Sequence, residues 1–148
     1  MKGGIELVHR LAEVTESVAR RELAEAVGTL RAAETRVTDL QAERAVAARQ
    51  TTAAAESGST AAELAARYRY IAALEARIDQ AGIEAGNWME QVTGLQGRWL
   101  ETRREQRGLA RVIARRRERE IRERERRMQQ EVDDMRRVAV FGKVDVDG

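Results

Sequence analysis

A stripe of mostly apolar positions recurs through the middle of the chain at alternating spacings of three and four. The stripe runs from residue 71 to residue 113 and consists of Ile71, Leu74, Ile78, Ala81, Ala85, Trp88, Val92, Leu95, Trp99, Thr102, Gln106, Leu109 and Ile113. Only an α-helix brings residues with this spacing onto one narrow stripe, and a stripe sustained over several heptads needs a second helix to cover it. The pattern therefore predicts a long helix in a coiled coil.

A second helical pattern precedes this one, from about residue 5 to about residue 49. Its apolar residues fall into two registers: first Leu7, Leu11, Val14 and Val18, then Leu23, Ala26, Leu30, Ala33, Val37 and Leu40. Insertions into a heptad pattern locally overwind or underwind a coiled coil. The shift between the registers therefore predicts a local change in supercoil winding.

Between residues 50 and 60 the stripe gives way to small and polar residues, which predict a turn. Thr60 and Glu63 have the spacing of a capping box, which marks the start of a second helix. In an antiparallel hairpin the two stripes cover each other, whereas a parallel dimer leaves the break at 50–60 unexplained. The predicted fold class is all-α, with two long helices forming an antiparallel coiled-coil hairpin and the second helix longer than the first.

The pattern also sets the expected domain boundaries. We expect a single hairpin domain over 1–138, with helix 1 at about 5–49, the apex at 50–60 and helix 2 at about 61–138. Residues beyond about Arg104 would then have no helix 1 to lie against. Residues 139–148 alternate between apolar and small or polar residues with no visible partner strand, so we expect a disordered tail there.

Composition supports an elongated helical protein and argues against an enzyme. The chain has no proline, no cysteine, 35% charged residues and 3% aromatic residues, which is typical of long solvated helices. Its one histidine, His9, is expected on a solvated face, and no phosphate-binding glycine loop or metal-ligand spacing is present. We therefore expect no catalysis, no cofactor and no metal. With no apolar run long enough to span a bilayer and no secretory signal, the predicted location is cytoplasmic.

Positive charge is concentrated in one segment, residues 98–127, which holds thirteen arginines and six glutamates for a net charge of +7. One explanation is a self-solvating helix held by pairs of opposite charge at helical spacing. Another is that the excess charge meets an acidic partner surface or the lumen of a ring. A third is nucleic acid, but no interleaved aromatic residues or recognisable nucleic-acid fold motif support it.

Two further features stand out after the apex. Tyr70, Leu74 and Arg77 form an i, i+4, i+7 row, which is typical of a partner-binding patch, although a position on the flank of the core explains Leu74 equally well. Glycines recur every eleven residues and therefore share one helix face, at Gly86, Gly97 and Gly108. These are either tolerated surface glycines or a smooth strip where another protein approaches closely or where the helix bends.

Several stretches together resemble the FliJ family, small coiled-coil proteins of the flagellar type III export apparatus. They are VARRELAEA at 18–26, YRYIAALEARI at 68–78, the tryptophan-containing middle of helix 2, and QEVDDM at 130–135. The resemblance covers nearly the whole chain. It implies a two-helix antiparallel coiled coil similar to the central stalk of rotary ATPases.

The resemblance also implies partners. Members of this family sit in the hexameric export ATPase, promote assembly of its ring, contact the transmembrane export gate FlhA and bind export chaperones. This would place the chain at the inner face of the cell membrane, associated peripherally through the export apparatus. No small-molecule substrate is implied.

Two sets of site residues are expected on this basis. The gate-contacting surface near the apex corresponds to Tyr70 and Leu74, with Leu40 facing them, and Arg77 completes the row. For the ATPase ring we expect the N-terminal part of helix 1 and the arginine-rich segment, represented by Arg104, Arg107, Arg111, Arg115, Arg119 and Arg122.

Three alternatives remain at this stage. The stalk protein of a virulence-type secretion system shares the same architecture, and the sequence separates the two poorly. A basic coiled coil associated with nucleic acid would bind duplex in a strongly salt-dependent way. A membrane-surface scaffold would need a segment with a broad apolar face opposite a basic one, and no segment has both.

Overall fold

The computed structural model describes residues 2–146, which form two α-helices, α1 (Lys2–Glu56) and α2 (Ala61–Val146). α1 has 55 residues and α2 has 86. The described residues contain no strand. The predicted all-α fold with a longer second helix is therefore confirmed. The chain divides into two compact parts, one formed by Thr15–Thr102 and the other by the residues up to Val14 together with those from Arg103 onward.

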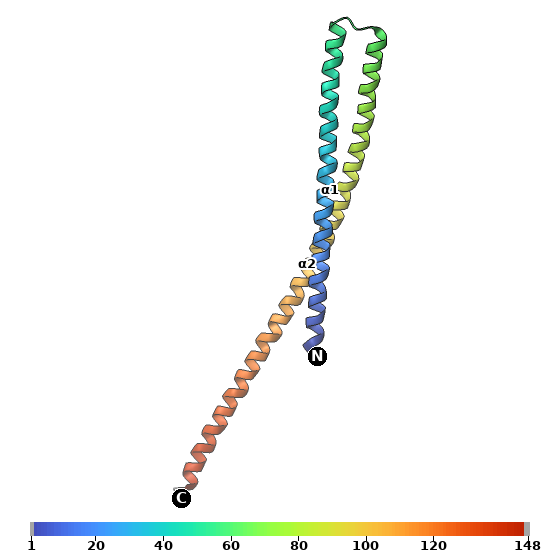
Figure 1. The fold of residues 1–148 in the computed structure, drawn as a ribbon. Helices are drawn as coiled ribbons and strands as arrows, with labels where there is room; N and C mark the ends of the chain where they lie inside the picture. The colour runs from blue at the N-terminus through green and yellow to red at the C-terminus, as the bar shows by residue number, and fades with distance from the viewer. Residues whose placement is uncertain (1, 147–148) are drawn as a thin grey trace. The chain divides into compact units, whose positions relative to one another are not determined.

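In the Thr15–Thr102 part, α1 and α2 lie side by side and antiparallel, joined by a short turn (Figure 1). The core cluster takes residues from both helices: Leu40, Ala47, Leu74 and Ala81, with Val37, Ile71 and Ile78 packed against it. On α2, every position of the predicted stripe from Ile71 to Ile113 is buried or half-buried. The stripe identified in the sequence is thus the face that α2 buries.

On α1, the buried face follows one register throughout, which corrects the predicted shift. Its positions are Ile5, His9, Ala12, Glu16, Ala19, Leu23, Ala26, Leu30, Ala33, Val37, Leu40, Arg44, Ala47, Thr51 and Ala54. The predicted first register is wrong, since the side chains of Leu7, Leu11 and Val14 are 58%, 58% and 61% exposed. Continuity with the Leu23–Leu40 stretch places alanines, His9 and Glu16 on the buried face. The prediction that His9 lies on a solvated face is wrong for the same reason.

The turn between the helices is closed by two capping motifs. The backbone N–H of Ser59 donates to the carbonyl of Ala54 and that of Gly58 to the carbonyl of Ala55, which together form a Schellman motif. Gly58 has a φ of 85°, a conformation that glycine adopts without steric cost. At the start of α2, the Thr60 hydroxyl accepts from the N–H of Glu63 while the Glu63 carboxylate accepts from the N–H of Thr60. The predicted capping box is therefore present.

The apex is shorter than the predicted 50–60, because α1 extends beyond the expected 5–49 to span Lys2–Glu56. Thr51 and Ala54 are 4% and 8% exposed, so the small residues after residue 49 continue the buried face. The hydroxyl of Thr51 donates to the carbonyl of Ala47, and that of Thr52 to Ala48. Small side chains and internally bonded hydroxyls therefore allow the helices to remain packed up to the turn.

The end of α2 also differs from the prediction. A disordered tail was expected at 139–148, but α2 continues through residue 146, and residues 147 and 148 lie outside the described residues. No proline interrupts this stretch, and a single glycine such as Gly142 costs a helix only about 1 kcal/mol. Alternating valines do not stop a helix, so the predicted end near residue 138 is wrong.

In the second part, the first turns of α1 lie against α2 well beyond Arg104. A groove between them is lined by Ile5 and Glu6 of α1 and, on α2, by Ile113, Arg116, Arg117 and Glu120. The predicted end of helix pairing near Arg104 is therefore too early. From residue 121 to residue 142, every residue is exposed. Neither helix, over the residues that the structure describes, has a stretch apolar enough to cross a membrane.

Candidate partner-binding surfaces

The residues expected to contact the export gate divide into a buried pair and an exposed pair. Leu74 is 1% exposed and Leu40 is 6% exposed, and both belong to the core cluster that joins α1 to α2. Tyr70 is 48% exposed, and Arg77 is also exposed. Tyr70 and Arg77 are seven residues apart and flank the buried stripe. They form the accessible part of this surface, while the two leucines hold the helices beneath it together.

Tyr70 is fixed in place by a contact between the helices that the sequence did not reveal. Its hydroxyl donates to the Glu43 carboxylate of α1 at 2.6 Å. This hydrogen bond, with desolvation as a smaller cause, raises the pKa of the Tyr70 phenol. The sequence alone does not identify Glu43 as the partner of Tyr70. The two residues flank the seam on opposite helices, so they are matched only once the register between α1 and α2 is known. Tyr70 therefore presents an oriented ring to solvent.

A second polar contact between the helices starts from the residue after Glu43 on α1. Arg44 occupies a position of the buried face on α1, yet its guanidinium reaches out to Glu75 of α2. Its Nη2 and Nε atoms lie 2.6 and 3.0 Å from one carboxylate oxygen. Because both side chains are about half exposed, a pair of this kind contributes only about 0–1 kcal/mol. The pair therefore adds a specific contact between the helices without adding much stability.

The six arginines expected at the ATPase ring form one exposed stripe on α2. They are Arg104, Arg107, Arg111, Arg115, Arg119 and Arg122, and each is exposed. Spacings of three and four residues keep them on one side of the helix. At 100° per residue, Arg104 and Ile113 lie on opposite sides of the helix, so the arginines face away from the buried stripe. The packing of α2 therefore leaves this stripe open to a partner.

Local ion pairs compensate only part of this charge. Arg122 and Glu118 form an i, i+4 pair at 3.6 Å, with both side chains about two-thirds exposed. Such a pair stabilises a helix by roughly 0.2–0.5 kcal/mol. Since residues 98–127 carry seven more arginines than glutamates, pairing within the helix leaves excess positive charge. An acidic surface is the complementary partner for this stripe.

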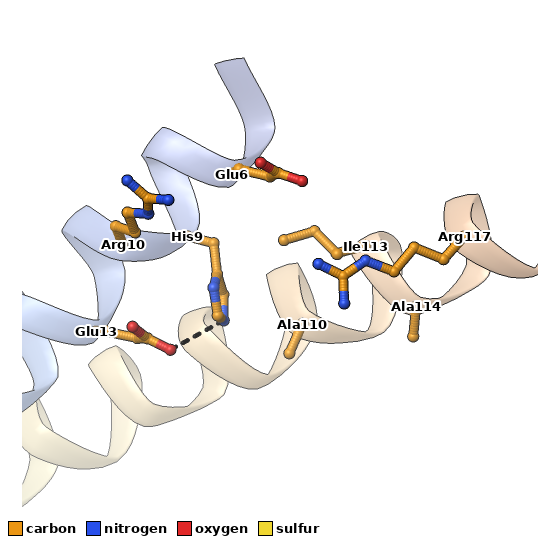
Figure 2. Close-up of a pocket in the computed structure, with 8 residues that line it drawn as sticks. All are labelled: Glu6, His9, Arg10, Glu13, Ala110, Ile113, Ala114 and Arg117. Carbon is orange, nitrogen blue, oxygen red and sulfur yellow. Dashed lines mark ion pairs between the residues drawn. The ribbon is translucent and has the colours of Figure 1, made fainter. Parts of the chain in front are cut away.

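Figure 2 shows the groove between the first turns of α1 and the 110–117 stretch of α2. His9 points from α1 towards Ala110 and Ile113, and its Nε2 atom lies 3.7 Å from the Glu13 carboxylate. That nitrogen is buried without a hydrogen-bond partner. Glu6, Arg10 and Arg117 complete the rim, so the groove carries charges of both signs. The described residues contain no group of three side chains suited to holding a metal ion.

Trp99 and Trp88 are half-buried on the α2 seam, as their spacing predicts. The indole N–H of Trp99 donates to the Glu16 carboxylate of α1 at 3.0 Å. The sequence does not predict this contact, because a register based on Val14 and Val18 places Glu16 outside the seam. A polar pair inside a coiled-coil seam favours one register over others. The glycines Gly86, Gly97 and Gly108 have open space where a Cβ would lie.

These features define a class of protein: a two-helix antiparallel coiled coil whose longer helix carries an arginine stripe on the face opposite its buried seam. The family described as Flagellar FliJ protein matches residues 1–143. The chain belongs to the FliJ family, and the resemblance noted in the sequence is confirmed. It is therefore a stalk-type component of flagellar protein export. Comparisons with curated proteins and with solved structures gave no match.

Proposed function

We propose that this chain is a non-catalytic stalk and assembly factor of the flagellar protein export ATPase, linking the hexameric ring to the export gate FlhA. Family membership over residues 1–143 supports a role in flagellar export rather than in a virulence-type system. The observation that carries the assignment of a ring-binding surface is the arginine stripe, because its residues are exposed and face away from α1. Association with export chaperones and a location at the inner face of the membrane follow from the same role.

The stripe from Arg104 to Arg122 is the proposed contact with the ATPase. A ring lumen lined by carboxylates would attract this stripe, and arginine forms bidentate hydrogen bonds with carboxylates. The helix needs no rearrangement to present these side chains, since all six are already exposed. Binding should therefore weaken with increasing salt.

The proposed contact with the gate is the surface around Tyr70 and Arg77, supported by the buried Leu40 and Leu74. A partner that touched the two leucines directly would have to separate α1 from α2, because Leu74 is 1% exposed. Tyr70 is accessible and held by Glu43. Truncating the leucines should thus affect gate binding through loss of folding, and changing Tyr70 should affect it directly.

The function is tested with the purified cognate export ATPase and the full chain. Wild-type protein should increase ATP hydrolysis and hexamer formation, whereas a variant with the six stripe arginines changed to glutamine should lose most of this effect. The matched control changes six exposed arginines elsewhere to glutamine and removes the same charge: Arg31, Arg36, Arg49, Arg67, Arg69 and Arg137.

Stimulation that survives in the stripe variant, or that is lost equally in the control, would show that the stripe is not the ring contact. If saturating wild-type protein changes neither hydrolysis nor assembly, the stalk function itself is wrong. Strong salt-dependent binding to duplex DNA in place of ATPase stimulation would favour the nucleic-acid alternative.

A further inference from the structure

The exposed end of α2 carries an apolar stripe of its own. Ile121, Met128, Val132 and Met135 are 54%, 65%, 43% and 71% exposed. Ile121, Met128 and Met135 are seven residues apart, and Val132 lies four residues after Met128, so all four lie on one side of the helix. We call these four residues the C-terminal stripe. Their spacing is that of a coiled-coil seam.

The C-terminal stripe is not a continuation of the seam that packs against α1. Heptad steps onward from Ile113 reach Glu120 and Arg127, which are charged. The C-terminal stripe follows positions one residue later, and one residue corresponds to a rotation of about 100° around the helix. The sequence therefore directs this apolar face away from the face that α1 covers.

Charges near the C-terminal stripe indicate how a second helix would be oriented if it covered the stripe. Glu125 occupies the seam position between Ile121 and Met128. In a parallel pair of identical helices, Glu125 would face its own copy, and like charges placed opposite each other destabilise a seam. In an antiparallel pair, Glu125 of each copy can instead face Met128 of the other. That same register places Ile121 opposite Val132.

The antiparallel register also matches charges beside the seam. It brings Arg124 of one copy next to Glu131 of the other, and the two-fold symmetry repeats this pair. Both residues are exposed, so they are accessible to a second chain. Arginine and glutamate flanking a seam are known to set partner orientation in coiled coils. A second copy of this chain is thus complementary to the stripe in the spacing of its seam residues and in charge.

We propose that two copies of this chain associate reversibly through an antiparallel coiled coil of their C-terminal stripes. The contact is isologous: Ile121 packs on Val132, Met128 packs beside Glu125, and Arg124 pairs with Glu131, each twice. This association is independent of the proposed role at the export ATPase.

Cysteine cross-linking tests the orientation cleanly, because the natural chain contains no cysteine. Full-length Ile121→Cys and Val132→Cys variants are mixed under mild oxidation, and the disulfide-linked peptides are identified by mass spectrometry. An antiparallel pair gives the mixed disulfide and leaves Val132→Cys alone largely uncoupled. A Val132→Cys disulfide with itself as the main product indicates a parallel pair and overturns the proposal.

Sedimentation equilibrium tests the interface itself. Wild-type protein should show a concentration-dependent dimer, and Met128→Glu should weaken it more than about tenfold, equivalent to about 1.4 kcal/mol. Met89→Glu is the matched control, because Met89 is a 50% exposed methionine on α2 outside the stripe. Its dimer should be as strong as that of the wild type.

A charge exchange tests the register. Arg124→Glu should weaken the dimer, and adding Glu131→Arg in the same chain should restore it. Wild-type protein that stays monomeric at all concentrations, or a Met128→Glu dimer as strong as that of Met89→Glu, contradicts the proposal. Helical circular dichroism of every variant verifies that the chain remains folded.

Discussion

The two halves of α2 show what a coiled-coil helix looks like with and without a covering helix. From Ile71 to Ile113 each position of the apolar stripe is buried or half-buried, and from residue 121 to residue 142 every residue is exposed. The first half is stabilised by burial against α1. The second half has local side-chain contacts, such as the i, i+4 hydrogen bond that Gln129 donates to Asp133. The same helix can therefore pack at one end and leave its side chains available to partners at the other.

The largest expected difference between the two halves comes from truncating one large apolar residue in each. Leu74→Ala should lower the free energy of unfolding by about 2–5 kcal/mol, because Leu74 is buried at 1% exposure. Met128→Ala should change it by less than about 0.5 kcal/mol, because Met128 is 65% exposed. Urea unfolding of dilute protein, followed by circular dichroism, measures both. Equal losses would mean that the two halves are packed alike.

Two glycine substitutions should act in opposite directions. Gly58→Ala should destabilise the hairpin by about 1–2 kcal/mol, since the φ of 85° disfavours a Cβ. Gly108→Ala should stabilise α2 by up to about 1 kcal/mol, because the glycine is helical and its missing Cβ would meet nothing within 4 Å. Thermal unfolding of the two variants gives the signs. Destabilisation by Gly108→Ala would indicate a close packing contact on that face.

Removing an ion pair should have a small and local effect. Glu118→Gln should cost roughly 0.2–0.5 kcal/mol of helix stability around Arg122, since the pair is exposed. Amide hydrogen exchange should accelerate near residues 115–125 and stay unchanged near Leu74. The difference should shrink in high salt, because salt screens exposed charges. A loss of protection throughout the hairpin would mean that the pair supports more than its own turn.

The smallest effect is expected for the Tyr70–Glu43 contact and is best observed by titration. In a Tyr68→Phe background, the Tyr70 phenol should ionise at higher pH with Glu43 present than in Glu43→Gln, because the hydrogen bond raises its pKa. The stabilisation from this contact should be present below the ordinary tyrosine pKa of about 10 and be lost as the pH rises through the raised value. Ultraviolet absorbance of tyrosinate measures the midpoint. An unchanged midpoint in Glu43→Gln would exclude the contact.

The sequence predicted the α2 face because large residues such as Trp88 and Leu95 leave one possible register. It failed on the first third of α1, where the seam uses Ala12, Glu16 and His9 while Leu7 and Val14 stay exposed. Hydrophobicity alone favoured the larger residues. Continuity with the register of residues 23–40 determines which face is buried, and the local pattern of residues 7–18 does not contain that information.

The candidate surfaces were predictable to different degrees. The arginine stripe could be read from spacing, because exposed residues at helical intervals depend little on the partner helix. The surface near the apex could not, since the burial of Leu74 and the anchoring of Tyr70 by Glu43 depend on how α1 and α2 are paired. Predicting contacts between residues distant in sequence requires the register between α1 and α2, which the structure provides.

Amide hydrogen exchange of α2, measured with and without the cognate export ATPase, tests the central claim most directly. Alone and at low concentration, the chain should exchange slowly around Leu74 and rapidly beyond residue 121. With the ATPase, new protection should appear between Arg104 and Arg122, where the stripe is exposed. Unchanged exchange over that stretch, despite stimulation of ATP hydrolysis, would contradict the account.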